Sequence, residues 1–256
     1  MNLKFNITLG EQYKSKAQKI RVMSEDWLCH NMYCPCCGNY HLNKFANNRP
    51  VADAFCEKCG EIFELKSSAG TIKEKIVDGE YSTMIERIQS NSNPHLFVLQ
   101  YDVSCYTVSR LELVPKFFFV PAIIKQRKPL SATAKRAGWT GCNIDYRGIP
   151  QQGKILVIEQ GVQRSAPDVI KEYTQAVRLM TNNIGQRGWL FEVLDCINKI
   201  PMEEFSIDDV YQFEADLQKL HADNHNIKPK IRQQLQFLRD RGVIDFLSHG
   251  QYKKRS

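Results

Sequence analysis

The 256-residue sequence predicts a mixed α/β protein built from two domains. Three observations support this prediction. Two Cys-x-x-Cys-Gly motifs bracket strand-like segments near the N-terminus, strand and helix patterns alternate through the middle of the chain, and the C-terminal part has the pattern of three helices and a hairpin. Hydrophobic residues make up 43% of the chain and charged residues 25%, which suits packed cores with ordinary surfaces.

The N-terminal elements follow from hydrophobic spacing. Residues 10–30 have helical periodicity, with core positions expected at four residues: Tyr13, Ala17, Ile20 and Trp27. Two further helices are expected at residues 83–89 and 167–180. Alternating or continuous apolar runs predict strands at residues 51–55, 61–66, 96–101, 111–114 and 154–158.

Four cysteines near the N-terminus predict a zinc site. Cys34 with Cys37, and Cys56 with Cys59, form two Cys-x-x-Cys-Gly motifs separated by eighteen residues. Two such turns supply four thiolates, the closed shell of a structural zinc ion, and the glycines permit tight turns beneath the metal. Cys36 is a rival ligand, although only Cys37 has both the two-residue gap and the following glycine. Disulfides and unpaired buried thiols are the alternatives.

The cysteine count bears on those alternatives. The chain has nine cysteines, an odd number, and neither a signal peptide nor a long apolar span opens it. These features predict a cytoplasmic, reducing environment without membrane attachment, in which disulfides are disfavoured.

A second motif overlaps the second cysteine pair. Glu64 and Lys66 lie two residues apart, so on a strand they project from the same face, and Asp53 precedes them in a short strand. Two carboxylates brought together across the cysteine turn can hold Mg²⁺, while a nearby lysine orients water or stabilises developing charge. The order matches the PD-(D/E)XK nuclease pattern, although Pro50 lies three residues before Asp53 instead of beside it. A solvated strand face is the alternative.

The distribution of charge indicates a polyanionic partner. The net charge is +7 and the isoelectric point is near 8.9. Residues 113–144 carry six basic side chains and no acid, and residues 228–256 carry eight against two acids. Residues 203–216 instead carry six acids and no base. Two basic surfaces suit a protein that binds a duplex at two places, although ordinary solvated faces would give the same pattern.

The C-terminal segment, residues 183–256, predicts a winged-helix domain. Residues 189–197 have helical spacing. Ser206 is suited to cap a second helix at residues 208–220. Asn226 is suited to cap a third helix, which ends at Gly242. Pro229 is tolerated in the first turn of that third helix, whose apolar face consists of Ile227, Ile231, Leu235 and Leu238. Two short strands at residues 243–246 and 251–252 complete the layout.

The third helix of a winged helix enters the major groove. The polar face of this one carries residues that can contact adenine or guanine edges or phosphates: Lys228, Arg232, Gln233, Gln236 and Arg239. The basic run Lys253, Lys254 and Arg255 suits phosphate contacts. The alternative is that the winged helix binds another protein.

Several stretches together resemble the DpnI-type methyl-directed restriction endonucleases. Besides the cysteine motifs, the resemblance rests on residues 48–53 (NRPVAD), 63–66 (FELK), 126–130 (QRKPL), 136–143 (RAGWTGCN) and 231–235 (IRQQL). It extends over essentially the whole chain. It implies an α/β PD-(D/E)XK nuclease core with structural zinc at residues 1–182, followed by a winged-helix DNA-binding domain at residues 183–256.

The resemblance also implies the activity. The expected reaction is Mg²⁺-dependent cleavage of double-stranded DNA at GATC sites that carry 6-methyladenine, by Asp53, Glu64 and Lys66, with no obligate protein partner. The family's tryptophan falls on Trp139, which follows Lys135 and Arg136 in a polar loop and is suited to lie against bases. Two other hypotheses remain: a PD-(D/E)XK nuclease of different specificity, and a non-enzymatic zinc and winged-helix regulator. The intact trio of Asp53, Glu64 and Lys66 argues against the regulator.

Overall fold

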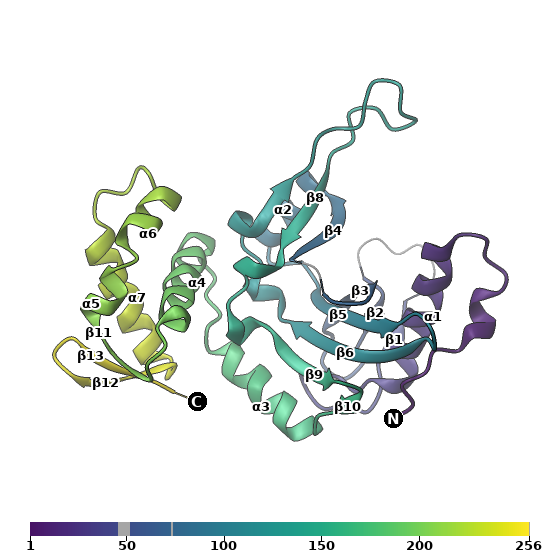
Figure 1. Ribbon diagram of the computed structural model, residues 1–256, viewed down its shortest axis with the longest axis horizontal. Helices are drawn as coiled ribbons and strands as arrows, with labels where there is room; N and C mark the ends of the chain where they lie inside the picture. Colours follow the sequence, from purple (N-terminus) through teal and green to yellow (C-terminus); the bar gives the residue numbers. More distant parts are fainter. Residues whose placement is uncertain (46–51, 73, 256) are drawn as a thin grey trace. The chain divides into compact units, whose positions relative to one another are not determined.

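The computed structural model describes residues 1–45, 52–72 and 74–255. The chain forms two compact units, Met1–Val177 and Arg178–Ser256 (Figure 1). Each unit has its own buried apolar core. Within the described residues, no helix combines the length and the apolar character needed to cross a membrane.

The first unit is organised around a seven-stranded sheet in the order β1-β2-β3-β5-β6-β9-β10. These strands are β1 (Asn43–Lys44), β2 (Ala54–Phe55), β3 (Ile62–Ala69), β5 (His95–Asp102), β6 (Thr107–Val114), β9 (Ile155–Glu159) and β10 (Val162–Gln163). β3 and β5 run parallel, and the other neighbouring pairs are antiparallel. The central strand β5 is buried along most of its length, which explains its continuous apolar run.

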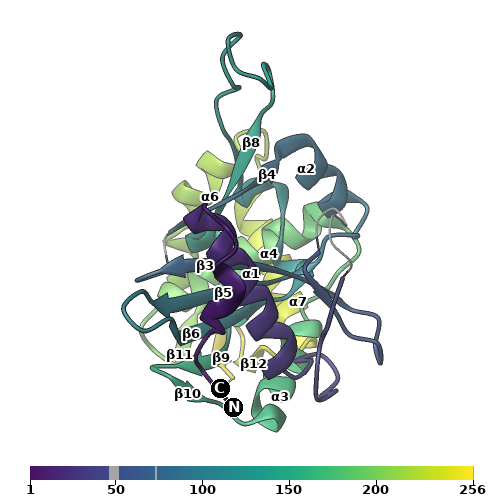
Figure 2. The ribbon, with the colours of Figure 1, turned by 90° about the vertical axis from the view of Figure 1, so that its right-hand side faces the viewer.

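Helices cover this sheet. α1 (Lys16–Asn31) packs against β3, and Figure 2 shows it crossing in front of the strands. α3 (Ala166–Val177) packs against β9. Short 3₁₀ helices lie in the connections, at η1 (Ile7–Gly10), η2 (Lys116–Phe118), η3 (Pro121–Ile123), η4 (Tyr146–Gly148) and η5 (Gln151–Gly153).

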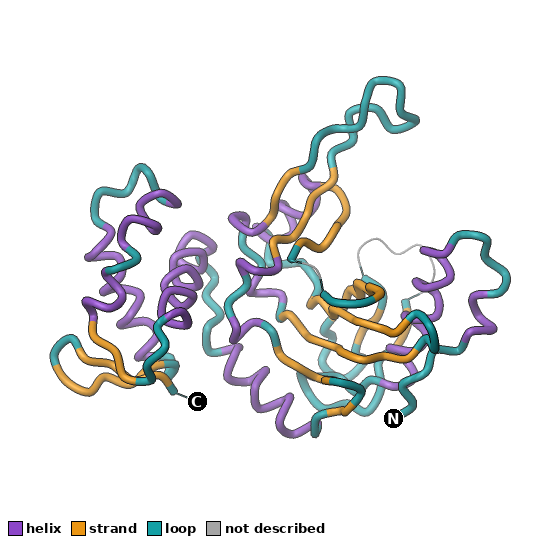
Figure 3. The backbone as a smooth tube through the Cα atoms, viewed as in Figure 1, coloured by secondary structure: helices purple, strands orange, loops and turns teal. Residues whose placement is uncertain are grey.

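A smaller sheet in the same unit carries a long loop. Its order is β4-β8-β7, with β4 (Lys75–Glu80), β8 (Gly141–Asp145) and β7 (Ile124–Gln126). α2 (Tyr81–Gln89) contacts all three strands. Residues 127–140 join β7 to β8, and this loop, hereafter the β7–β8 hairpin loop, extends away from the rest of the unit (Figures 1 and 3).

The predicted elements of this unit are mostly confirmed, with two corrections. The first helix begins at Lys16 and not at residue 10, because residues 7–10 form a 3₁₀ turn and Ser15 is extended. Trp27 is buried as predicted, but Tyr13 lies before the helix and Ala17 is exposed. The strand expected at residues 51–55 is limited to β2 within the described chain. Val51, like Pro50, lies outside the described residues.

The second unit is a helical bundle with a small sheet. Its helices are α4 (Ile184–Lys199), α5 (Ile207–Tyr211), α6 (Glu214–Leu220) and α7 (Ile227–Asp240). Its strands are β11 (Glu204–Ser206), β12 (Ile244–Ser248) and β13 (Gln251–Lys254), in the order β11-β13-β12. The predicted core face of α7 is confirmed, since Ile227, Ile231, Leu235 and Leu238 are all buried. Gly242 ends α7 with φ of +68°.

Two features of this unit differ from the sequence prediction. The helix expected at residues 208–220 is broken at Gln212 and Phe213 into α5 and α6. Ser206 caps α5 as predicted, in a reciprocal capping box with Asp209, but the Asn226 side chain makes no capping hydrogen bond. The strand β11 was not predicted, because three residues are too few to show an alternation of polar and apolar side chains.

Candidate active site and metal centre

Four cysteine thiols converge in the first unit. The Sγ atoms of Cys34, Cys37, Cys56 and Cys59 all lie within 4.8 Å of one another. Cys34 and Cys59 are 3.6 Å apart, and Cys37 and Cys56 are 3.7 Å apart. A tetrahedral zinc ion with Zn–S bonds of about 2.3 Å requires sulfur–sulfur edges of about 3.8 Å. The geometry therefore fits a four-thiolate zinc site.

The two cysteine turns have the same backbone geometry. The amide of Gly38 donates to Cys34 O at 2.8 Å, and the amide of Gly60 donates to Cys56 O at 2.9 Å. Gly38 and Gly60 have φ of +76° and +75°, which explains the glycine after each pair. Cys36 is not a member of the cluster, and its Sγ lies 3.8 Å from His95 Nε2.

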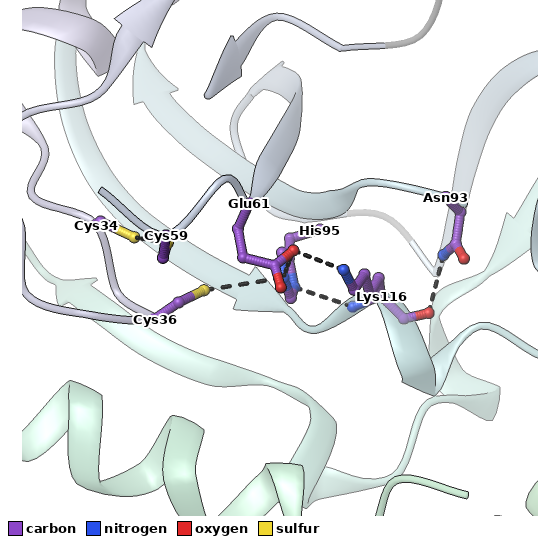
Figure 4. A network of polar contacts seen from close by, with 7 residues as sticks. All are labelled: Cys34, Cys36, Cys59, Glu61, Asn93, His95 and Lys116. Atoms are coloured by element: carbon purple, nitrogen blue, oxygen red, sulfur yellow. Dashed lines mark hydrogen bonds and ion pairs between the residues drawn. The ribbon is translucent and has the colours of Figure 1, made fainter. Parts of the chain in front are cut away.

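A partly buried polar network adjoins the cluster (Figure 4). His95 Nδ1 accepts the Lys116 amide at 3.1 Å, so Nε2 carries the ring proton of the neutral imidazole and donates to Glu61 Oε2 at 3.1 Å. Lys116 Nζ lies 2.6 Å from the same Glu61 oxygen. His95 and Lys116 outweigh burial and lower the pKa of Glu61 to about 2. The network fastens the end of the second cysteine turn to β5.

The predicted trio flanks that turn, with Asp53 before it and Glu64 and Lys66 after it. Glu64 and Lys66 project from the same face of β3, with Glu64 Oε1 2.6 Å from Lys66 Nζ. The amide of Leu65, between them, donates to Asp53 Oδ2 at 2.7 Å. This bond leaves Asp53 Oδ1 for another partner. The structure thus brings the three side chains together, as the alternation of β3 predicts.

Burial and charge shape the protonation of this trio. Burial raises the pKa of Glu64 to about 7, and the nearby carboxylates of Asp78 and Asp53 add to the shift. Burial also raises the pKa of Asp53. Burial alone would lower the pKa of Lys66, but Glu64 and Asp78 outweigh it, so the net shift is upward and Lys66 stays protonated. Such crowded carboxylate oxygens suit a hard divalent cation like Mg²⁺.

α1 forms the opposite wall of a cleft that contains Lys66. The cleft has a volume of about 460 Å³ and includes Arg21, Ser24 and Glu25 of α1 with Lys66, Ser67 and Ser68 of β3. Glu25 is 6% exposed and is held by Arg21 at 2.6 Å and by Lys44 at 3.1 Å. A polyanion that entered this cleft would meet the cationic side chain of Arg21 on one wall and that of Lys66 on the other.

Sequence reasoning missed two acidic residues here, Asp78 and Glu25. Asp78 Oδ1 lies 2.8 Å from Lys66 Nζ, yet it belongs to β4 in the other sheet. No motif spacing links Asp78 to Lys66, because their contact depends on how the two sheets meet. Glu25 lies on the buried face of α1, which packs against β3. An acidic residue among the apolar positions of that helix was the sequence signal that could have identified it.

The β7–β8 hairpin loop displays the predicted basic and aromatic residues. Lys135 and Arg136 are exposed, and the Arg136 guanidinium lies 4.8 Å from the centre of the partly exposed Trp139 ring. A Cβ added at Gly141 would come within 2.9 Å of the same ring. The ring is therefore fixed between a cation and the start of β8, with part of its surface accessible.

The polar face of α7 lies on the surface of the second unit. Arg232, Gln233 and Gln236 are exposed. Lys228 is also exposed, but its Nζ lies 3.5 Å from Glu214 Oε2 of the acidic α6. Lys228 is therefore partly engaged within the unit, whereas Arg232 and Gln236 stand one turn apart on the helix surface.

Comparison with protein families covers nearly the whole chain. The family model DpnI, described as the Dam-replacing family, matches residues 1–182. The model DpnI_C, described as the Dam-replacing HTH domain, matches residues 185–254.

Proposed function

Because the chain belongs to the DpnI family of methyl-directed restriction endonucleases, we propose that it hydrolyses double-stranded DNA at GATC sites that carry 6-methyladenine. We assign catalysis to residues 1–182, with Asp53, Glu64 and Lys66 as the catalytic residues, and a winged-helix DNA-reading role to residues 183–256. The observation that supports this proposal best is the contact of Lys66 with Glu64 beside a main-chain-anchored Asp53.

The side chains divide the chemistry between them. Asp53 Oδ1 and the Glu64 carboxylate would hold Mg²⁺, which when bound withdraws charge from the scissile phosphate and acidifies the attacking water. Lys66 donates a hydrogen bond to the water or to the phosphate oxygens, where negative charge develops. The water oxygen bonds to phosphorus as one ester P–O bond breaks, the water gives up a proton, and the leaving oxygen takes one up.

The four-cysteine cluster has a structural role in this proposal. Its four thiolates would complete the shell of a bound zinc ion, so no position would remain for a substrate. The cluster instead stiffens the turn between β2 and β3, which carries Asp53 on one side and Glu64 on the other.

DNA reading is assigned to two surfaces. α7 would lie in the major groove, where Arg232, Gln233 and Gln236 can reach base edges and Lys228 a phosphate. In the first unit, Trp139 would lie against the bases while Lys135 and Arg136 contact the backbone. The adenine methyl group lies in the major groove, so either surface can sense it as extra apolar area.

The deciding experiment is digestion of one plasmid prepared with and without adenine methylation at GATC. With Mg²⁺, we expect cleavage of the methylated plasmid alone, and no cleavage in EDTA or by Asp53→Ala. Cleavage of both plasmids would indicate a nuclease of different specificity. DNA binding without cleavage in any divalent metal would leave the regulator hypothesis.

A further inference from the structure

The ammonium group of Lys66 is held by two carboxylates from two different sheets. Glu64 Oε1 of β3 lies 2.6 Å from Nζ, and Asp78 Oδ1 of β4 lies 2.8 Å from it. A lysine ammonium has three N–H donors. One of them donates to Asp78 Oδ1, and the ion pair with Glu64 holds the ammonium from a second side, so a remaining N–H can donate to a water or phosphate oxygen. These two contacts therefore restrict the directions in which the remaining N–H groups point.

Asp78 is itself fixed by an irregularity in its strand. Along β4 and β8, Asp78 pairs with Cys142 and Glu80 with Gly141, so Gly79 is left without a partner across the sheet. The freed Gly79 amide donates instead to Asp78 Oδ1 at 2.7 Å. Such bulges redirect side chains next to functional sites. The Asp78 side chain is only 10% exposed, which restricts its movement further.

From this arrangement we infer that Asp78 is a positioning residue that orients Lys66 for the hydrolysis. The inference rests on the proposed nuclease function. Glu64 is also assigned to hold the cation, so among the described residues Asp78 is the carboxylate partner of Lys66 that has no other assigned role. Because β4 is aligned by β8, the position of Asp78 depends on the sheet that carries the β7–β8 hairpin loop.

The test compares the cleavage rate with DNA affinity. In full-length protein, Asp78→Ala should lower the single-turnover rate constant on methylated DNA by on the order of 100-fold, the cost of a misplaced catalytic group. Asp78→Asn should lose roughly tenfold, because its amide oxygen still accepts both hydrogen bonds but carries no charge. The dissociation constant for the same DNA without Mg²⁺ should stay within about threefold of wild type, since Asp78 contacts Lys66 and not the groove surfaces.

Glu80 supplies the matched control. It is the next acid along β4, it is exposed, and it accepts a hydrogen bond from Thr83 at 2.9 Å. Glu80→Gln should cleave at the wild-type rate. If the Asp78 variants cleave like wild type, or if affinity falls as far as the rate, Asp78 does not position Lys66. Should Asp78→Ala fail to fold, Asp78→Asn decides alone. Absence of cleavage by wild-type protein would instead refute the proposed function.

Discussion

At the scale of single residues, the sequence shows the parts of the candidate site that lie on one strand. The alternation of β3 places Glu64 and Lys66 on one face, and their contact confirms it. The sequence also shows that Asp53 precedes them, but it does not show what holds the Asp53 carboxylate. That carboxylate accepts the Leu65 amide, and this hydrogen bond depends on how β2 and β3 pair. Asp78 could not be found, since it reaches Lys66 from a separate sheet.

The roles of Asp53 and Lys66 lead to a first prediction. Asp53→Ala and Lys66→Ala should each lower Mg²⁺-dependent cleavage by more than about 100-fold, because they remove a metal ligand and a donor to developing charge. Folding and DNA binding should be largely retained, which circular dichroism and a binding assay without Mg²⁺ would measure. Rapid cutting by either purified variant would show that the active site is misassigned.

At the scale of elements, the cysteine turns were predictable because their geometry is local. Each needs only two cysteines, a two-residue gap and a glycine with positive φ. The break between α5 and α6 was not predictable in the same way, since residues 208–220 keep helical spacing across it. The start of α1 was also misplaced, because residues 10–15 continue the helical spacing in the sequence but follow a 3₁₀ turn at residues 7–10 and end in an extended serine.

The four-cysteine cluster leads to a second prediction, in which Cys59→Ser is compared with Cys105→Ser. Wild-type protein should contain about one zinc per chain, and loss of a ligand should cost at least about 2 kcal/mol of folding free energy. The melting temperature of Cys59→Ser should therefore fall by at least roughly 4 °C, with a loss of activity. Cys105 is exposed and outside the cluster, so its variant should behave as wild type. Full activity in metal-free protein would contradict a structural role for zinc.

The β7–β8 hairpin loop leads to a third prediction. A methyl group at Gly141 would lie 2.9 Å from the Trp139 ring, so Gly141→Ala must displace the ring. If that ring reads the methylated bases, the cleavage rate on methylated DNA should fall roughly tenfold or more. Gly188→Ala is the control, because apart from its own neighbours in the helix no atom lies within 4 Å of the added methyl group, and alanine favours a helix such as α4. Equal rates for Gly141→Ala and wild type would remove Trp139 from methyl reading.

At the scale of the whole molecule, basic surface is divided between the two units. One part belongs to the β7–β8 hairpin loop and the other to α7 and the C-terminal residues. Phosphate contacts from either surface add affinity without sequence information. Specificity for a methylated site must therefore come from the few side chains that we propose to reach the bases, Trp139 in one unit and the exposed α7 residues Arg232, Gln233 and Gln236 in the other.

This division leads to the last prediction, which concerns the isolated second unit. Residues 183–256 include most of the second unit and of its buried core, so we expect them to fold alone and to bind GATC duplex. One buried methyl group contributes about 0.8 kcal/mol, so the isolated unit should prefer methylated over unmethylated duplex by only about fourfold. Dissociation constants measured at one salt concentration would test this, with Arg232→Ala as the control for base reading.

Full-length protein should discriminate more strongly in cleavage than this unit does in binding, because the methyl groups would be sensed again beside Trp139. Trp139→Ala should then reduce cleavage of methylated DNA while leaving binding by the isolated second unit unchanged, since that unit lacks the residue. If full-length protein cuts methylated and unmethylated GATC plasmids equally at physiological salt, neither surface reads the methyl group. The proposed active site would then belong to a nuclease whose specificity is set by other features of the DNA.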